Sequence, residues 1–192
     1  MSQFENPTWN GTPLDQNAKN VCQERIKAMY GCLRAWTLMP SWAKQEGQGG
    51  CGEIGVAVRA SAFAAVRFWI NFFKLKATND RMDPNLYIQD PKYWDLQQSG
   101  NHPEDFLYSH FGMSPLNIPD TATKQALAFT WWWASKAFAH PTRLYLTLGN
   151  PFPADRQLGI STSFLISELD LRGCPKWSDP EKQCNGRRCI LY

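Results

Sequence analysis

The sequence of 192 residues predicts an α/β fold with a helical N-terminal lobe and a C-terminal lobe in which helices flank a small parallel sheet. Three observations predict this class. Apolar residues recur at helical spacing from 17 to about 42, a long apolar segment follows the glycine-rich loop at 47–50, and alternating segments occupy 143–150 and 161–171. The length suits one well-buried core, so we expect a single domain that covers residues 1–192.

The N-terminal lobe is expected to span about residues 17–120 and to be mainly helical. One or two helices before residue 42 carry the first two cysteines. The apolar segment 51–76 is predicted to be either a long buried helix or a helix that passes into a strand near Phe68. Residues 77–120 contain Asn, Asp, Pro and Gly at short intervals, which predicts loops with short helices.

A helix is expected to open the C-terminal lobe, which spans about residues 121–192. Its N-cap is predicted to be Asp120 or Thr121, and Pro141 is expected to end it at His140. The two alternating segments come next, first a strand that ends in Gly-Asn and then a second strand. These strands are the expected parallel sheet.

Three consecutive tryptophans lie in this helix, within the stretch TWWWASKAFAH of residues 130–140. Consecutive helical residues point about 100° apart, so Trp131, Trp132 and Trp133 are not expected to face one core together. At least one of them is predicted to face something else. The nine tryptophans of the chain suit either a core or a stacking surface for flat ligands.

Charge and hydropathy restrict the classes of partner. The formal net charge of +3 arises from nearly balanced charges without a basic stripe or an acidic tail, so no nucleic-acid partner is expected. No apolar run approaches the roughly 20 residues that a membrane-spanning helix needs, so no membrane span is expected. The N-terminus as written has no charged region followed by an apolar one, and therefore no signal peptide is predicted in this chain.

Six cysteines fit three disulfides in an oxidising compartment as well as they fit six buried thiols in a reducing one. Their spacing contains no CxxC pair, so a structural zinc site is not expected. We favour disulfides, and with them a secreted, extracellular or lumenal location.

A cysteine nucleophile is one interpretation of the stretch GGCGEIG. Cys51 would open a helix after a glycine-rich loop, where the helix N-terminus stabilises a thiolate. His140 and Asp155 could complete a triad, which would make the protein a cysteine-dependent hydrolase or transferase. The competing interpretation is that Cys51 is half of a disulfide.

A second interpretation rests on an aromatic face, a hydroxyl and a carboxylate. Trp131 and Ser135 are four residues apart and share one face of a helix. Glu168 lies within the apolar run SFLISELDL, where an ionisable group is costly unless function needs it. Such groups in a cleft would suit a substrate with a sugar ring. The alternatives are that Trp131 packs in the core and Glu168 points to solvent, or that the chain is a non-catalytic Trp-rich binding module.

The stretches TWWWASKAFAH, RLYLTLGN and STSFLISEL resemble the central signature of the ADP-ribosyl cyclase family of NAD glycohydrolases. In that family a helix that begins with Phe-Trp precedes a strand ending near Gly-Ser and a Ser/Thr-x-Phe-x-x-x-Glu element. The matching positions of this chain are Trp131, Ser135, Gly149, Asn150, Ser163, Phe164 and Glu168. Upstream, Cys32 and Trp36 are similar to the family's Cys-x-x-x-Trp, and Trp69 is the candidate for a second family tryptophan.

The resemblance implies cleavage of the bond between nicotinamide and ribose in NAD, with ADP-ribose, cyclic ADP-ribose or both as products. It makes Glu168 the catalytic carboxylate, because a carboxylate stabilises the positive charge that builds on the ribose. The substrate-binding residues that it implies are Trp131, Trp69, Ser135, Ser163 and Phe164. NAD is then the substrate, neither a metal nor a further cofactor is expected, and a homodimer is a possible assembly.

The chain departs from the family's pattern in two places. Gln89 stands where the family has the glutamate of an acidic Leu-Glu-Asp segment, so the balance of products is not implied. The family's cysteine before the Phe-Trp helix is missing. With the remaining cysteines, the resemblance implies that Cys22 and Cys32 form a disulfide and that Cys51 pairs with a tail cysteine, which is one of Cys174, Cys184 or Cys189.

Overall fold

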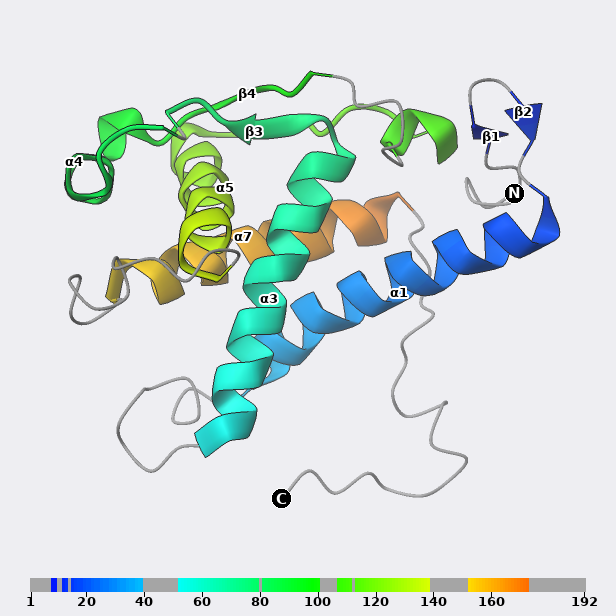
Figure 1. Ribbon diagram of the computed structural model, residues 1–192, viewed down its shortest axis with the longest axis horizontal. Helices are drawn as coiled ribbons and strands as arrows, with labels where there is room; N and C mark the ends of the chain where they lie inside the picture. The colour runs from blue at the N-terminus through cyan, green and yellow to red at the C-terminus, as the bar shows by residue number, and fades with distance from the viewer. Residues whose placement is uncertain are drawn as a thin grey trace.

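The structure is a computed structural model, and it describes residues 8–9, 12–13, 15–39, 52–79, 81–100, 107–111, 113–138 and 152–172. Four long helices dominate these residues, together with short helical turns and two small sheets (Figure 1). In chain order the elements are β1 (Thr8–Trp9), β2 (Thr12–Pro13), α1 (Gln16–Leu38), α3 (Gly52–Phe72), β3 (Leu75–Ala77), α4 (Pro84–Gln89), the 3₁₀ turn η1 (Pro91–Tyr93), β4 (Leu96–Gln98), the 3₁₀ turn η2 (Tyr108–Phe111), α5 (Thr121–Trp133), the π-helical turn η3 (Ala134–Phe138) and α7 (Phe152–Leu171).

Helix α1 confirms the predicted N-terminal helix and runs without a break to Leu38. The Asp15 side chain caps it by accepting a hydrogen bond from the Ala18 N–H at 2.7 Å. The buried residues of α1 recur every three or four positions and so form one stripe. They are Cys22, Ile26, Tyr30, Leu33 and Trp36. This stripe packs against α3 and α7.

The predicted disulfide between Cys22 and Cys32 is wrong. Both cysteines lie on α1, ten residues apart, which corresponds to about 15 Å of helical rise. A disulfide needs Cα atoms closer than about 7 Å, so an intact helix keeps the two sulfurs apart. Both are free thiols, and burial raises the pKa of each. Cys51 and the three tail cysteines lie outside the described residues.

Helix α3 confirms the long helix that was one of the two predictions for its segment, but it is only partly buried, with Ile54 and Val56 exposed near its start. It does not pass into a strand near Phe68, because aromatic rings spaced for a helix keep packing as far as Phe72 and Phe73. The chain then turns at Lys74, which adopts a left-handed φ of 58°, and enters β3. By length and apolar composition alone, the part Ile54–Phe72 of this helix could cross a membrane, although 39% of it is buried inside the fold.

Helix α5 begins at Thr121, and its N-cap is Asp120, which was one of the two predicted caps. One carboxylate oxygen of Asp120 accepts a hydrogen bond from the Thr123 N–H at 2.7 Å, and the other accepts one from the Thr123 hydroxyl at 2.8 Å. The described helix continues through η3 to Phe138, and its predicted end at His140 lies outside the described residues.

The expectation that one of the three tryptophans faces away from the core is wrong, because Trp131, Trp132 and Trp133 are all buried. Helix α5 contacts α3, α7 and the β3–β4 pair, so rings that point in different directions all meet other parts of the protein (Figure 1). A helix that is packed on several sides need not have a polar face. The direction in which each ring points from the helix therefore does not reveal which tryptophan contacts a ligand.

The predicted parallel sheet is also wrong. The segment 161–171 belongs to helix α7, whose buried residues Leu158, Leu165 and Leu169 recur at helical spacing. The sheets of the described residues are two antiparallel pairs, β1 with β2 and β3 with β4. The other predicted strand, 143–150, lies outside the described residues. The described part of the chain is therefore mostly helical with a small antiparallel component.

Buried apolar residues from α1, α3, α5 and α7 form one core cluster, so the two expected lobes share a core in the described part of the chain. The short helices between β3 and α5 agree with the prediction for residues 77–120, whereas the strand β4 in this range was not predicted. Polar contacts also cross this core. The hydroxyls of Thr130 on α5 and Ser161 on α7 are buried 3.0 Å apart. This contact links the helix that carries Trp131 to the helix that carries Glu168.

Candidate functional site

Helix α7 holds Glu168 near its C-terminal end, with 20% of the side chain exposed. The Oε2 atom accepts a hydrogen bond from Nη2 of Arg172, one helical turn further on, at 3.0 Å. The Arg172 side chain is itself only 11% exposed. The carboxylate is thus largely buried, paired with a cation and still reachable from solvent.

Arg172 ties this carboxylate to the segment that leads into α5. Its Nη1 donates to the carbonyl oxygen of Ser114 at 2.7 Å and to the Ser114 hydroxyl at 3.0 Å, and its Nη2 donates to the carbonyl oxygen of Pro115 at 3.0 Å. The guanidinium also lies over the ring of Phe73, 5.2 Å from the centroid. We call Glu168, Arg172, Phe73, Ser114 and Pro115 the Glu168 site.

Aromatic rings extend from Phe73 in two directions. The ring of Trp69 stacks on it at 6.4 Å and is completely buried, so Trp69 has a core position and not the predicted position on a ligand-binding surface. The ring of Tyr108, in the 3₁₀ turn η2, stacks on Phe73 with 5.7 Å between the ring centroids. Tyr108 is only half-buried. Tyr108 therefore has exposed surface next to the Glu168 site, whereas Trp69 packs on Phe73 from within the core.

Trp131 and Ser135 lie together, as their spacing predicts, but both are engaged within the protein. The Trp131 indole N–H donates to Oδ1 of Asn71 on α3 at 2.7 Å, and 9% of the residue is exposed. The Ser135 hydroxyl donates to the carbonyl oxygen of Trp131 at 2.9 Å. This bond lies where the α-helix changes into the π-helical turn η3, a feature that often marks functional sites.

The structure places Trp131 and Glu168 in the same helical core but at different levels. Thr130, the neighbour of Trp131, contacts Ser161 of α7. Glu168 lies seven residues beyond Ser161, or about 10 Å further along the axis of α7. Trp131 and Glu168 are connected by the packing of α5 against α7. Among the described residues no hydrogen bond joins them directly.

The other matched residues of α7 divide between its faces. Phe164 is half-buried and lies one turn before Glu168, on the same side of the helix. Ser163 is exposed and, five residues before Glu168, points about 140° away from it. Gly149 and Asn150 lie outside the described residues.

The alternative cysteine triad has one described member. Nε of Arg59 on α3 donates to the Asp155 carboxylate on α7 at 2.6 Å, and Arg59 is buried. Asp155 therefore joins two helices through an ion pair. Cys51 and His140 lie outside the described residues.

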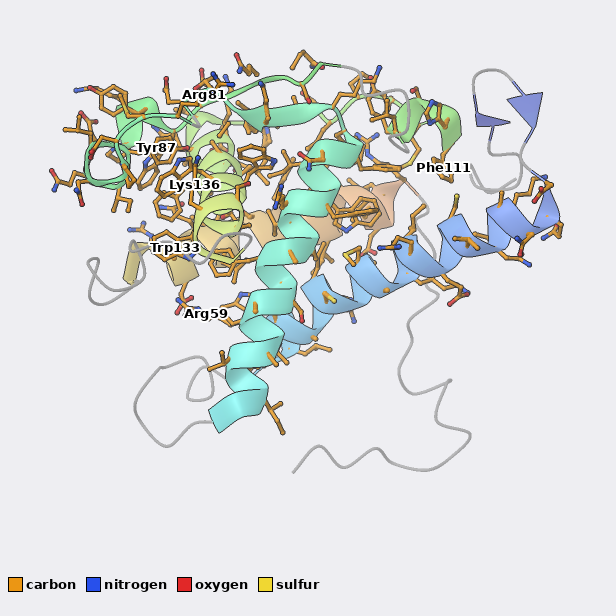
Figure 2. The ribbon with its side chains drawn as sticks, in the orientation of Figure 1. Arg59, Arg81, Tyr87, Phe111, Trp133 and Lys136 are labelled. Carbon is orange, nitrogen blue, oxygen red and sulfur yellow. The ribbon has the colours of Figure 1, made fainter. Side chains whose placement is uncertain are left out.

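Figure 2 shows that the tryptophan cluster and the rings near η2 lie on opposite sides of α3, with Tyr87 and Trp133 on one side and Phe111 on the other. Trp132 stacks on Tyr87 at 4.4 Å, and Phe111 contacts Phe72 at 5.6 Å. The two aromatic groups are therefore separate parts of the core. Of these two groups, the one that includes Phe73 contacts Arg172, the hydrogen-bond partner of Glu168.

Sequence analysis missed Arg172, Ser114 and Tyr108. The spacing of Glu168 and Arg172 would have revealed the first, because residues four apart on a helix are neighbours. The strand prediction hid this pair, since four residues of a strand span about 13 Å. Ser114 and Tyr108 approach the site only through the tertiary fold, and no local pattern indicates them.

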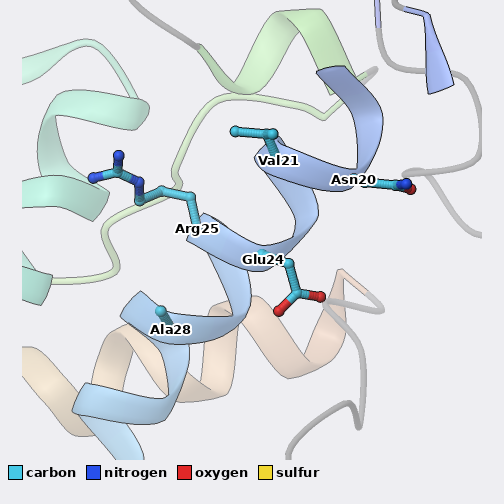
Figure 3. Close-up of a pocket in the computed structure, with 5 residues that line it drawn as sticks. All are labelled: Asn20, Val21, Glu24, Arg25 and Ala28. Carbon is cyan, nitrogen blue, oxygen red and sulfur yellow. The ribbon is translucent and has the colours of Figure 1, made fainter. Parts of the chain in front are cut away.

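An open pocket of about 440 Å³ lies elsewhere, on the outer surface of α1 (Figure 3). Its lining residues all come from that helix and are Asn20, Val21, Glu24, Arg25 and Ala28. Within the described ranges no cluster of three His, Cys, Asp or Glu side chains could hold a metal ion.

Glu168 is the predicted catalytic residue that lies within the described ranges, and its side chain is 20% exposed. A fixed, partly exposed carboxylate can stabilise positive charge that develops on a bound substrate, and a neighbouring aromatic ring can stack on a flat group. Comparison of the chain with models of protein families, with curated proteins and with solved structures finds no match.

Proposed function

We propose that the protein cleaves the bond between nicotinamide and ribose in NAD, with Glu168 as the catalytic carboxylate. The observation that carries this proposal is the Glu168 carboxylate itself, which is mostly buried, anchored by Arg172 and partly open to solvent. The resemblance of residues 130–140 and 161–169 to the ADP-ribosyl cyclase signature supplies the substrate. The products are nicotinamide together with ADP-ribose, cyclic ADP-ribose or both.

The reaction needs a negative charge close to the ribose. In NAD the nicotinamide nitrogen is positively charged, and when the glycosidic bond breaks its electron pair stays on that nitrogen. Nicotinamide leaves as a neutral ring, and the positive charge moves to the ribose. A carboxylate that is already in place lowers the barrier, because it gains attraction as this charge forms. The leaving group requires no proton.

Two acceptors can capture the ribosyl cation. Attack by water forms a new C–O bond, releases a proton and yields ADP-ribose. Attack by a ring nitrogen of the adenine of the same molecule forms a C–N bond and yields cyclic ADP-ribose. Gln89 is exposed at the end of α4. It has no carboxylate with which to favour one of the two acceptors.

The burial of the aromatic residues changes the roles that we propose for them. Tyr108 takes the place of Trp69 as the ring with surface to offer a flat ligand beside the Glu168 site. Trp69 supports Phe73 and through it the Arg172 guanidinium. Trp131 on α5, which is 9% exposed, remains a proposed substrate contact. It lies near the level of Ser161 on α7 and not near that of Glu168.

Incubation of the purified protein with NAD, followed by separation of the products, tests the proposal. We expect free nicotinamide to appear in step with the loss of NAD, together with one or both nucleotide products. Preincubation with a thiol-alkylating reagent separates the alternatives, because a mechanism that depends on Cys51 would lose turnover and one that depends on Glu168 would keep it. Persistence of NAD at high protein concentration would overturn the proposal.

A further inference from the structure

The guanidinium of Arg172 is anchored independently of Glu168. Three of its four Nη–H groups are donated to oxygen atoms of Ser114 and Pro115, and its plane rests over the Phe73 ring. Only the remaining N–H is donated to the carboxylate. Apart from Glu168, these contacts come from Phe73, which directly follows α3, and from the segment before α5, so the position of the cation is set by the fold.

This arrangement determines which carboxylate oxygen is held. A guanidinium often binds a carboxylate through two parallel hydrogen bonds and then occupies both oxygens. Here the other Nη donors bond Ser114 and Pro115, Nε has no hydrogen-bond partner among the described residues, and the bond from Nη2 reaches Oε2. Oε1 is thereby left to approach a substrate, while the rotation of the side chain is restricted by the bond to Oε2.

We propose that Arg172 is a positioning residue that fixes Glu168 through Oε2 and presents Oε1 to the ribose. This inference rests on the proposed function. A carboxylate held in place before the reaction needs little reorganisation in the transition state, and a displacement of about 1 Å can cost on the order of 100-fold in rate. Arg172 acts through Glu168 and does not itself contact the reacting atoms.

Lysine cannot reproduce this contact pattern. Its ammonium is a compact charge with three N–H groups at one nitrogen, whereas the Arg172 guanidinium donates to four acceptor atoms from two nitrogens. Arg172→Lys therefore keeps the charge next to Glu168 but loses the anchored geometry. The variant therefore distinguishes a role of Arg172 in positioning Glu168 from a role in which it only neutralises the charge of Glu168.

The test is a double-mutant cycle on NAD turnover with Arg172→Lys and Glu168→Gln, singly and combined. We expect Arg172→Lys to lower kcat on the order of 10- to 100-fold with KM within about twofold, because substrate binding is unchanged while the carboxylate is misplaced. In the Glu168→Gln background the same change should lower the residual kcat no further, because the positioned carboxylate is already gone. Arg156→Lys, at an exposed position of the same helix, is the matched control and should leave kcat at the wild-type value.

Each outcome of this cycle bears on one proposal or both. An equal loss in both backgrounds would show that Arg172 has only a structural role, and wild-type kcat in Arg172→Lys would likewise overturn positioning while the proposed function stands. A wild-type protein that leaves NAD intact, or a fully active Glu168→Gln, overturns both proposals. If Arg172→Lys does not fold, Ser114→Ala takes its place, since it removes one acceptor of the guanidinium and should lower kcat several-fold only when Glu168 is present.

Discussion

The three tryptophans of helix α5 and the glutamate Glu168 of helix α7 both stood out in the sequence, but they have different environments in the fold. The tryptophans of α5 are enclosed on several sides, and the indole N–H groups of Trp132 and Trp133 are buried without hydrogen-bond partners among the described residues. Glu168 of α7 keeps part of its side chain exposed and is held by a directed hydrogen bond. The comparison teaches that the aromatic residues mainly build this core, while polar residues at its edge are held by directed hydrogen bonds and keep some surface exposed.

The largest expected effect on stability comes from the aromatic side of this comparison. Trp132→Ala should lower the free energy of unfolding by about 3–5 kcal/mol, because it removes a fully buried ring that stacks on Tyr87. Denaturant unfolding measures this change. Val21→Ala, at a position that is 55% exposed, is the control and should change stability by less than about 0.5 kcal/mol. A Trp132→Ala protein as stable as the wild type would contradict the role of the cluster as core.

A smaller effect is expected where α3 meets α5. Asn71→Ala removes the acceptor of the Trp131 indole N–H and leaves a nearly buried donor unsatisfied, which should cost about 1–3 kcal/mol. The melting temperature and denaturant midpoint of the variant measure this cost. Asn85→Ala, on the exposed face of α4, should have no comparable effect. If Asn71→Ala is neutral, the Trp131 bond does not contribute to holding the two helices together.

The smallest expected effect depends on pH and concerns the end of α7 next to Glu168. The Tyr30 hydroxyl donates to the Asp170 carboxylate at 2.5 Å, and burial followed by this hydrogen bond raises the pKa of Tyr30 to about 12. The folded state therefore keeps its proton at pH values where the unfolded state has lost it. The resulting stability is present below pH 10, the usual pKa of tyrosine, and is lost as the pH rises from there toward 12.

Unfolding of the wild type and of Tyr30→Phe at pH 9 and pH 11 measures this contribution. The wild type should lose more stability between the two pH values than the variant, which has no hydroxyl to titrate. Equal losses in both proteins would show that the Tyr30–Asp170 contact does not couple proton binding to folding.

The sequence predicted the helices better than the site. Helical spacing and the cap at Asp120 indicated α1, α3 and α5 because these signals are local. The segment 161–171 was misread because its short apolar run fits both strand and helix periods, and Leu165 and Leu169 distinguish them only once their partners are known. If both cysteines had been assigned to one helix, their separation of ten residues would have excluded the Cys22–Cys32 disulfide.

The site was predictable only in part, for a related reason. Glu168 was noticeable as an ionisable residue in an apolar run, and its partly buried position agrees with that interpretation. The burial of Trp69 and of all three tryptophans of α5 depends on which elements surround their helices, and this information is not local. Ser114 and Pro115 reach Arg172 across more than fifty residues of chain, and no sequence pattern predicted that contact.

The measurement that tests the central claim most directly is the rate at which Glu168→Gln releases nicotinamide from NAD. Gln keeps the size of the side chain and removes its charge, so we expect a correctly folded protein whose kcat is lower by a factor on the order of 100 or more. Glu24→Gln, which removes an exposed carboxylate on α1, should retain the wild-type rate. A Glu168→Gln protein that releases nicotinamide as fast as the wild type would contradict the account.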